Sequence, residues 1–182
     1  MRAKKFILLF LTVIITVTLS ACASGRRVIP VSKLEFGMTK EQINALMDSE
    51  PDMSGDDYDV YLYRPSDLDA RLNSCIFNYN GAGRLYGFFI ESDYCEESEA
   101  EALRGDLMEK FDALYEFSDD GWLLNDEETG YSRVDFERKL AVMVRVNTDE
   151  DGFTASVTIM SDTHSEDENA ENIPVIPILN TN

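Results

Sequence analysis

The chain has 182 residues and carries 35 Asp and Glu residues against 16 Lys and Arg residues, a net charge of −19 at pH 7. This excess of negative charge excludes nucleic-acid binding through a basic surface. The length is sufficient for one domain with a hydrophobic core.

The first 22 residues have the layout of a secretory signal peptide. Three basic residues stand among the first five, residues 6–19 are apolar apart from threonines, and Ser20 and Ala21 precede Cys22. The ending Leu19-Ser20-Ala21-Cys22 resembles the lipobox of bacterial lipoproteins. The resemblance implies that residues 1–21 are removed and that Cys22 becomes the lipidated first residue. The chain is then anchored to the outer face of a bacterial membrane, either the plasma membrane or the outer membrane.

Two alternatives apply to this leader. A permanent membrane-spanning helix needs roughly 20 apolar residues, and the apolar run is shorter. The other alternative is an ordinary thiol at Cys22 after an ordinary signal. We favour the lipid anchor, because the spacing Leu19-Ser20-Ala21 before Cys22, behind a basic and then an apolar region, is fairly specific to lipoprotein signals. A diacyl anchor is also physically reasonable, since two acyl chains hold a protein on a membrane stably where one does not.

Residues 22–33 are expected to be a tether. Removal of residues 1–21 leaves 13 Lys and Arg against 35 Asp and Glu, a net charge of −22. Arg26, Arg27 and Lys33 would lie beside the bilayer, where each attracts anionic head groups by about 1 kcal/mol. A purely solubilising tether is the alternative.

A helix is predicted to begin after Thr39. Thr39 and Gln42 have the spacing of a capping box, and Ile43, Leu46 and Met47 fall on one helical face. Pro51 ends this helix at or before residue 50.

An alternating strand is expected over 58–64, with Tyr58, Val60 and Leu62 on one side. Tyr61 and Tyr63 alternate with that apolar face. They are therefore candidates for an exposed interaction surface, since aromatic rings are common interface anchors. The alternative is that both rings cover the second face of the sheet.

Residues 73–79 and 84–91 read as a β-hairpin around the turn 80–83. Both faces of this hairpin are apolar, with Phe77 and Phe88 on one face and Ile76 and Phe89 on the other. Such a sheet is covered by helices on one side and by something else on the other.

A second helix is predicted from Ser98, where Glu101 completes another capping box. Its apolar residues keep helical spacing: Ala100, Leu103, Leu107, Phe111 and Leu114. Four strands follow, over 122–125, 131–137, 139–147 and 153–160, and the acidic stretch between the last two is a hairpin turn. That stretch begins like a calcium-binding loop but has Thr158 where a bidentate Glu is required.

The fold class is therefore α+β, with antiparallel meanders and helices packed on one face of the sheet. We expect one domain over 34–161, with halves at about 34–95 and 96–161 that each form a helix-plus-meander unit.

After Thr163 the chain has no apolar period, so 162–182 is predicted to be a disordered acidic tail. Within it, Ile173–Leu179 is apolar but contains two prolines, which exclude a helix or a central strand. A loosely ordered end is expected there, with packing along a sheet edge or a docking role as alternatives.

The segment Phe36-Gly37-Met38-Thr39-Lys40-Glu41-Gln42-Ile43, behind a lipobox cysteine and a short tether, resembles the small lipoproteins of the outer-membrane assembly machinery (the SmpA/OmlA or BamE-like family). The doubled helix-plus-meander pattern is similar to the architecture of β-lactamase-inhibitor proteins. The resemblance implies a noncatalytic protein-binding module of the cell envelope. The family's usual Gly-x-Pro and second helix are not found after residue 47.

No residues stand out for catalysis, cofactor binding or metal binding. The only histidine, His164, lies in the predicted tail, where it cannot complete a triad or a zinc site. Cys75 and Cys95 are the two exported cysteines apart from Cys22, and either a disulfide or two free thiols is compatible with their positions.

We therefore expect a membrane-anchored envelope lipoprotein that is a noncatalytic protein-interaction module and not an enzyme. Its protein partner is not identified by the sequence. The alternative is a lipoprotein that binds a small ligand or a cation, which a large apolar pocket with convergent polar groups would favour.

Overall fold

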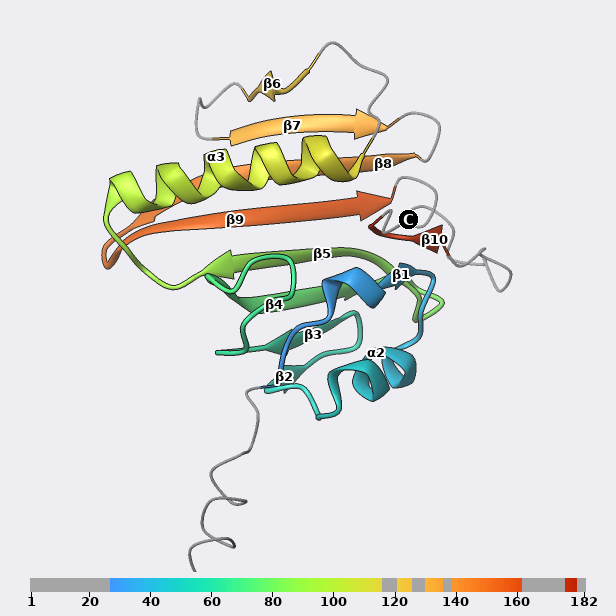
Figure 1. The fold of residues 1–182 in the computed structure, drawn as a ribbon. Helices are drawn as coiled ribbons and strands as arrows, with labels where there is room; N and C mark the ends of the chain where they lie inside the picture. The colour runs from blue at the N-terminus through green and yellow to red at the C-terminus, as the bar shows by residue number, and fades with distance from the viewer. Residues whose placement is uncertain (1–26, 116–120, 126–129, 136–138, 162–175, 180–182) are drawn as a thin grey trace, which may run out of the picture.

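The computed structural model describes residues 27–115, 121–125, 130–135, 139–161 and 176–179. Within them the chain has the predicted α+β class, with an eight-stranded antiparallel sheet and two α-helices (Figure 1). The strands of the sheet are, in spatial order, β2 (Met53–Ser54), β3 (Tyr58–Tyr61), β4 (Leu72–Tyr79), β5 (Leu85–Ser92), β9 (Gly152–Ser161), β8 (Leu140–Asp149), β7 (Gly130–Asp135) and β6 (Leu123–Leu124).

The helix α2 (Lys40–Met47) begins at the predicted capping box. The Gln42 N–H donates to Thr39 Oγ1 at 3.3 Å, and the Thr39 N–H donates to Gln42 Oε1 at 2.9 Å. These bonds satisfy two N–H groups for which the helix has no internal acceptor. The helix buries Ile43 and Met47 and ends at Asp48, which is left-handed.

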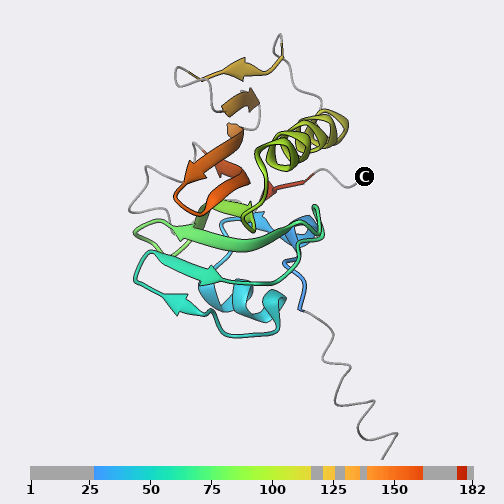
Figure 2. The same cartoon turned by 90° about the vertical axis from the view of Figure 1, so that its left-hand side faces the viewer.

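The helix α3 (Glu97–Leu114) begins earlier than predicted. The Glu96 N–H donates to the Glu99 carboxylate at 3.3 Å, so this pair closes the first turn in place of Ser98 and Glu101. The helix packs against β8 and β9, and Figure 2 shows it standing to one side of the strands. The predicted apolar residues face inward: Ala100, Leu103, Leu107 and Phe111 are buried.

The pairing of β5 with β9 joins the two halves of the chain into one sheet. Phe88 lies opposite Ile159, and Ile90 lies opposite Val157. These residues belong to one hydrophobic core that also holds the buried residues of α2 and α3, together with Cys75, Phe77, Val142 and Val144. Each large apolar side chain buried there contributes roughly 1.5–3 kcal/mol.

The hairpin turn is where the sequence places it. The Gly83 N–H donates to the Asn80 carbonyl at 2.8 Å, and Gly83 has a positive φ of 69° that favours glycine. A bulge between Asn78 and Tyr79 shifts the register. As a result Leu85 is fully buried on the core side, where simple alternation predicts the opposite face.

The packed chain extends beyond the predicted limits of 34–161 at both ends. Ile29 and Val31 are fully buried, although they fall in the segment predicted as a tether, and η1 (Val31–Lys33) is a short 3-10 helix. At the other end β10 (Ile176–Pro177) pairs with β1 (Glu35–Phe36), and residues 178 and 179 are buried. Burial of apolar side chains explains both additions. The leader with Cys22 and most of the predicted tail lie outside the described residues.

Candidate functional site

The segment that carries the family resemblance performs a folding role. Lys40, the first residue of α2, places its Nζ 3.5 Å from Asp59 Oδ1, and Asp59 is only 1% exposed. The hydroxyls of Tyr79 and Ser54 donate to the same carboxylate, the former at 3.0 Å. The Lys40 ammonium also lies 4.9 Å from the centre of the Tyr79 ring. A buried carboxylate with a cation and two donors is stabilised where an isolated one is not.

Tyr61 does not belong to an exposed surface. It pairs with Cys75, whose side chain is in the core, so its own ring faces the core and is 0% exposed. Its hydroxyl donates to Asn44 Oδ1, and its ring lies edge-on to Phe77 at 5.6 Å between centroids. Burial raises the pKa of Tyr61, so the hydroxyl stays protonated. The expectation of an exposed Tyr61 is corrected by this register.

Tyr63 is exposed, as predicted, with 78% of its surface accessible. It lies beyond the end of β3 and has a φ of 57°, a conformation that is uncommon for residues with a side chain. Such backbone costs of order 1–3 kcal/mol and is concentrated at functional sites. The conformation directs an aromatic ring into solvent beside the cleft described next.

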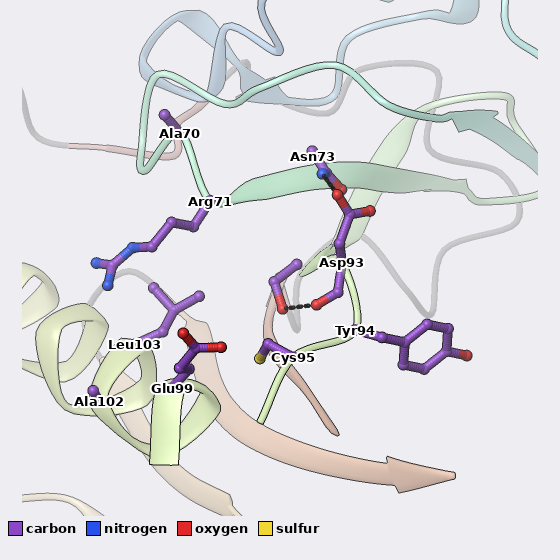
Figure 3. A pocket seen from close by; sticks show the side chains of 10 residues that line it. Ala70, Arg71, Asn73, Asp93, Tyr94, Cys95, Glu99, Ala102 and Leu103 are labelled. Carbon is purple, nitrogen blue, oxygen red and sulfur yellow. Dashed lines mark hydrogen bonds between the residues drawn. The ribbon is translucent and has the colours of Figure 1, made fainter. Parts of the chain in front are cut away.

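A cleft of about 570 Å³ lies where β4 begins and β5 ends, against the first turns of α3 (Figure 3). We call it the strand-end cleft; its lining residues are Ala70, Arg71, Asn73, Ser92, Asp93, Tyr94, Cys95, Glu99, Ala102 and Leu103. Asp93 also borders two adjoining hollows, both of which include Tyr63. Tyr63 and Tyr94, which is 52% exposed, therefore stand on the rim of one concave region.

Arg71 fixes the wall of the cleft between the β3–β4 loop and α3. Its guanidinium donates to both oxygens of Asp69 at 2.9 Å and to Asp106 on α3 at 2.7 Å. The hydrogen bonds from Arg71 lower the pKa of Asp69. Because its donors are used in this way, Arg71 acts as a brace and is less available to a ligand.

Asp93 and Tyr94 are held by local bonds. Asn73 donates to Asp93 at 2.6 Å across the strand ends, and the Tyr94 hydroxyl donates to Asp149 at the end of β8. This bond raises the pKa of Tyr94 to about 12. Figure 3 shows the Tyr94 ring turned away from the Cys95 thiol and the Glu99 carboxylate.

Cys75 and Cys95 are both free thiols, so the structure contains the second of the two predicted arrangements. Cys75 is fully buried between strands, whereas Cys95 is partly exposed and its thiol lies 3.4 Å from the Phe153 carbonyl. Burial, together with the Glu99 and Glu96 carboxylates, raises the pKa of Cys95. The thiol is therefore protonated at neutral pH and is a weak nucleophile.

Among the described residues, no three His, Cys, Asp or Glu side chains lie close enough together to hold a metal ion. Within the same ranges, no helix is both long and apolar enough to cross a bilayer. His164 lies outside them.

Comparison with protein-family models, curated proteins and solved structures gives no match to this chain. The resemblance of residues 36–43 to the outer-membrane assembly lipoproteins stays a prediction. In this structure those residues cap α2 and neutralise Asp59, which accounts for their identity through folding alone.

Proposed function

We propose that this chain is a membrane-anchored lipoprotein of the bacterial cell envelope that acts as a noncatalytic protein-interaction module. The observation that carries the proposal is the pair of exposed rings, Tyr63 and Tyr94, on the rim of the concave region that the strand-end cleft forms with its adjoining hollow. Tyrosine is enriched among the residues that dominate binding energy, because one ring brings a large apolar area and a polar tip. The lipobox-like ending at Cys22 supports the anchor.

The chemistry around the cleft supports binding in preference to catalysis. The Cys95 thiol has a raised pKa, and Arg71 is engaged by two carboxylates. The hydroxyl of Tyr94 is bonded to Asp149. A nucleophile requires an adjacent base or a lowered pKa, and these groups have neither.

The proposal includes an architecture of two helix-plus-meander units with both helices on one face of the sheet. It is supported by the single core that contains Ile43 and Met47 of α2 and Leu103 and Phe111 of α3. The antiparallel pairs β3–β4–β5 and β7–β8–β9 follow the two helices in the chain, which is the order that a repeated unit requires.

A second candidate function is the binding of a small ligand, because the cleft volume of about 570 Å³ is in the range of ligand sites. The lining is mixed, with Asn73, Asp93 and Glu99 beside Leu103. Ala102→Trp would fill this cleft from an exposed position on α3. Native mass spectrometry that shows a bound molecule in the wild type and none in this variant would favour the ligand-binding function.

Site-specific photo-crosslinking tests the protein-binding proposal. A benzoylphenylalanine is placed at Tyr63 or Tyr94 in the lipidated chain in its own membranes, with Leu124, which is 48% exposed, as the control position. We expect one discrete protein adduct from the two cleft positions and none from the control. Equal adducts at all three positions, or none at any, would contradict the proposal.

A further inference from the structure

The second face of the sheet carries a continuous row of side chains across all eight strands. We call the face opposite the core the outer face. The registered positions of the row are Met53, Val60, Ile76, Phe89, Thr158, Met143, Ser132 and Leu123. Seven of these eight are methionine, aliphatic, aromatic or threonine side chains, so the row is a band with a large apolar content.

The band lies outside the main hydrophobic cluster, although Val60 within it is only 6% exposed. Ile76, Phe89 and Met143 are neither core members nor packed against the core, and each is partly exposed. In the neighbouring row Tyr58 and Met160 are 40% and 41% exposed. Exposed apolar surface that is continuous over several strands marks an interaction surface.

Three charges stand at registered strand positions of the outer face: Glu91 on β5, and Arg145 and Asp149 on β8. Glu91 and Arg145 lie in one cross-strand row, with Ser156 of β9 between them. Among the described residues neither side chain has an ion-pair partner, and the buried Arg145 Nε has no hydrogen-bond acceptor. Desolvation and then the Asp149 carboxylate raise the pKa of Glu91, as expected of a carboxylate without a cation beside it.

We propose that the outer face is the interface of a homodimer, in which a two-fold axis along β9 places Glu91 opposite Arg145 of the second copy. A two-fold interface is self-complementary, so each copy gains both ion pairs. The same axis places Phe89 opposite Met143 of the second copy and Val60 opposite its Leu123, because β5 and β8, and likewise β3 and β6, are equally distant from β9.

The small residues along β9 suit such an axis. Ser156 and Thr158 occupy consecutive outer positions of β9, and Ser156 is 1% exposed. No long side chain at these two positions holds the two sheets apart at the axis. Two sheets that pack face to face lie about 10 Å apart, a distance that Glu and Arg side chains span together. A hollow of about 460 Å³ beside Glu91 gives the incoming guanidinium room.

The size of the face matches what a stable dimer needs. The seven strands from β3 to β6 are about 34 Å wide at about 4.8 Å per strand, and three rows extend about 20 Å along them. Such an overlap buries on the order of 1,400 Å² in total, which is within the range of specific interfaces. Asp149 adds one negative charge to this face beyond the Glu91 and Arg145 pair, and salt at physiological concentration screens charges that are more than about 8 Å apart.

Cross-linking in the native membrane tests the dimer. Thr158→Cys is introduced with Cys95→Ser, and a short bis-maleimide is added to membranes that contain the full lipidated chain. We expect a species of twice the chain mass, which mass spectrometry identifies as two copies. Ala113→Cys, on the exposed side of α3, is the matched control and should stay at least tenfold less cross-linked.

Charge exchange makes the test specific. Glu91→Arg and Arg145→Glu should each lower the cross-linking yield at least fivefold, since each brings like charges together, and the double variant should restore it. Circular dichroism confirms that each variant is folded. Failure of the double variant to restore the yield, a cross-link to a different protein, or equal yields from residues 113 and 158 would overturn the proposal. Tyr63 and Tyr94 line the same hollow as Glu91, so the mass of their photo-adducts separates the two proposals: an adduct with a different protein reports on the proposed function, and an adduct of twice the chain mass reports on the dimer.

Discussion

Lys40→Met should destabilise the fold by leaving the Asp59 carboxylate buried without its cation. Removal of one partner of a buried ion pair costs about 3–5 kcal/mol. The Lys40 side chain is 23% exposed, and the Tyr79 and Ser54 hydroxyls continue to donate to the carboxylate. We therefore expect a loss in the free energy of unfolding of about 2–4 kcal/mol, somewhat less than for a fully buried pair.

Urea unfolding followed by far-UV circular dichroism measures this loss. Lys33→Met is the matched control, because Lys33 is exposed in η1 and its change should stay within about 0.5 kcal/mol. The double variant Lys40→Met with Asp59→Asn should recover part of the loss, since an amide needs no cation and still accepts from Tyr79. A Lys40→Met midpoint equal to that of Lys33→Met would refute the folding role of the segment around Lys40.

Three further outcomes are expected. Cys22→Ala should release the chain from membranes or leave its leader uncleaved, whereas an unmodified Cys22 found by mass spectrometry in the membrane fraction would rule out the lipid anchor. Phe111→Ala should cost about 3–5 kcal/mol in chemical unfolding, since its ring is fully buried, while Ala113→Ser should change little; equal midpoints would contradict the helix placement. Asp69→Asn should destabilise the chain at pH 7. The pKa of Asp69 is lowered below its ordinary 3.8 in the folded state by the hydrogen bonds from Arg71, so the stabilisation is present above that pH and disappears as the pH falls through the folded-state pKa. A penalty that is the same at pH 3 and pH 7 would argue against this pairing.

Periodic features of the sequence predict the parts of the fold that depend on local spacing. The capping box at Thr39, the hairpin turn at Asn80 and the buried face of α3 follow from spacing and turn chemistry alone. The predicted faces fail at Leu85, because a bulge of one residue separates Leu85 from Gly87 and reverses the alternation on the turn side of the hairpin.

The pairing of strands that are far apart in the sequence cannot be predicted from local residue spacing. The β5–β9 ladder joins segments about 70 residues apart, and no local pattern selects it over other antiparallel pairs. The burial of Ile29 and Ile178 depends on the same tertiary arrangement. Alternation along the strand predicts an exposed Tyr61, because Val60 and Leu62 beside it have the character of a core face, and only the pairing of Tyr61 with Cys75 decides which face is buried.

The candidate site was predicted in part. Tyr63 is exposed as expected, but Tyr94 was missed. Its position between the second hairpin strand and the start of α3 is a signal that was available, since loops at strand ends carry many binding residues. The cleft itself arises from β4, β5 and α3 together and has no sequence signature.

The proposal that Tyr63 and Tyr94 bind a protein partner is tested by measuring how much of that partner a variant without the two rings retains. The lipidated wild type and the variant Tyr63→Ser with Tyr94→Ser are each solubilised from their own membranes. The measurement is the amount of the partner, as identified by photo-crosslinking, that co-purifies with each folded molecule. Both rings are largely exposed, so the thermal midpoint should be unchanged. We expect at least a tenfold loss of the partner at an unchanged midpoint. Full retention of the partner by the folded variant would contradict it.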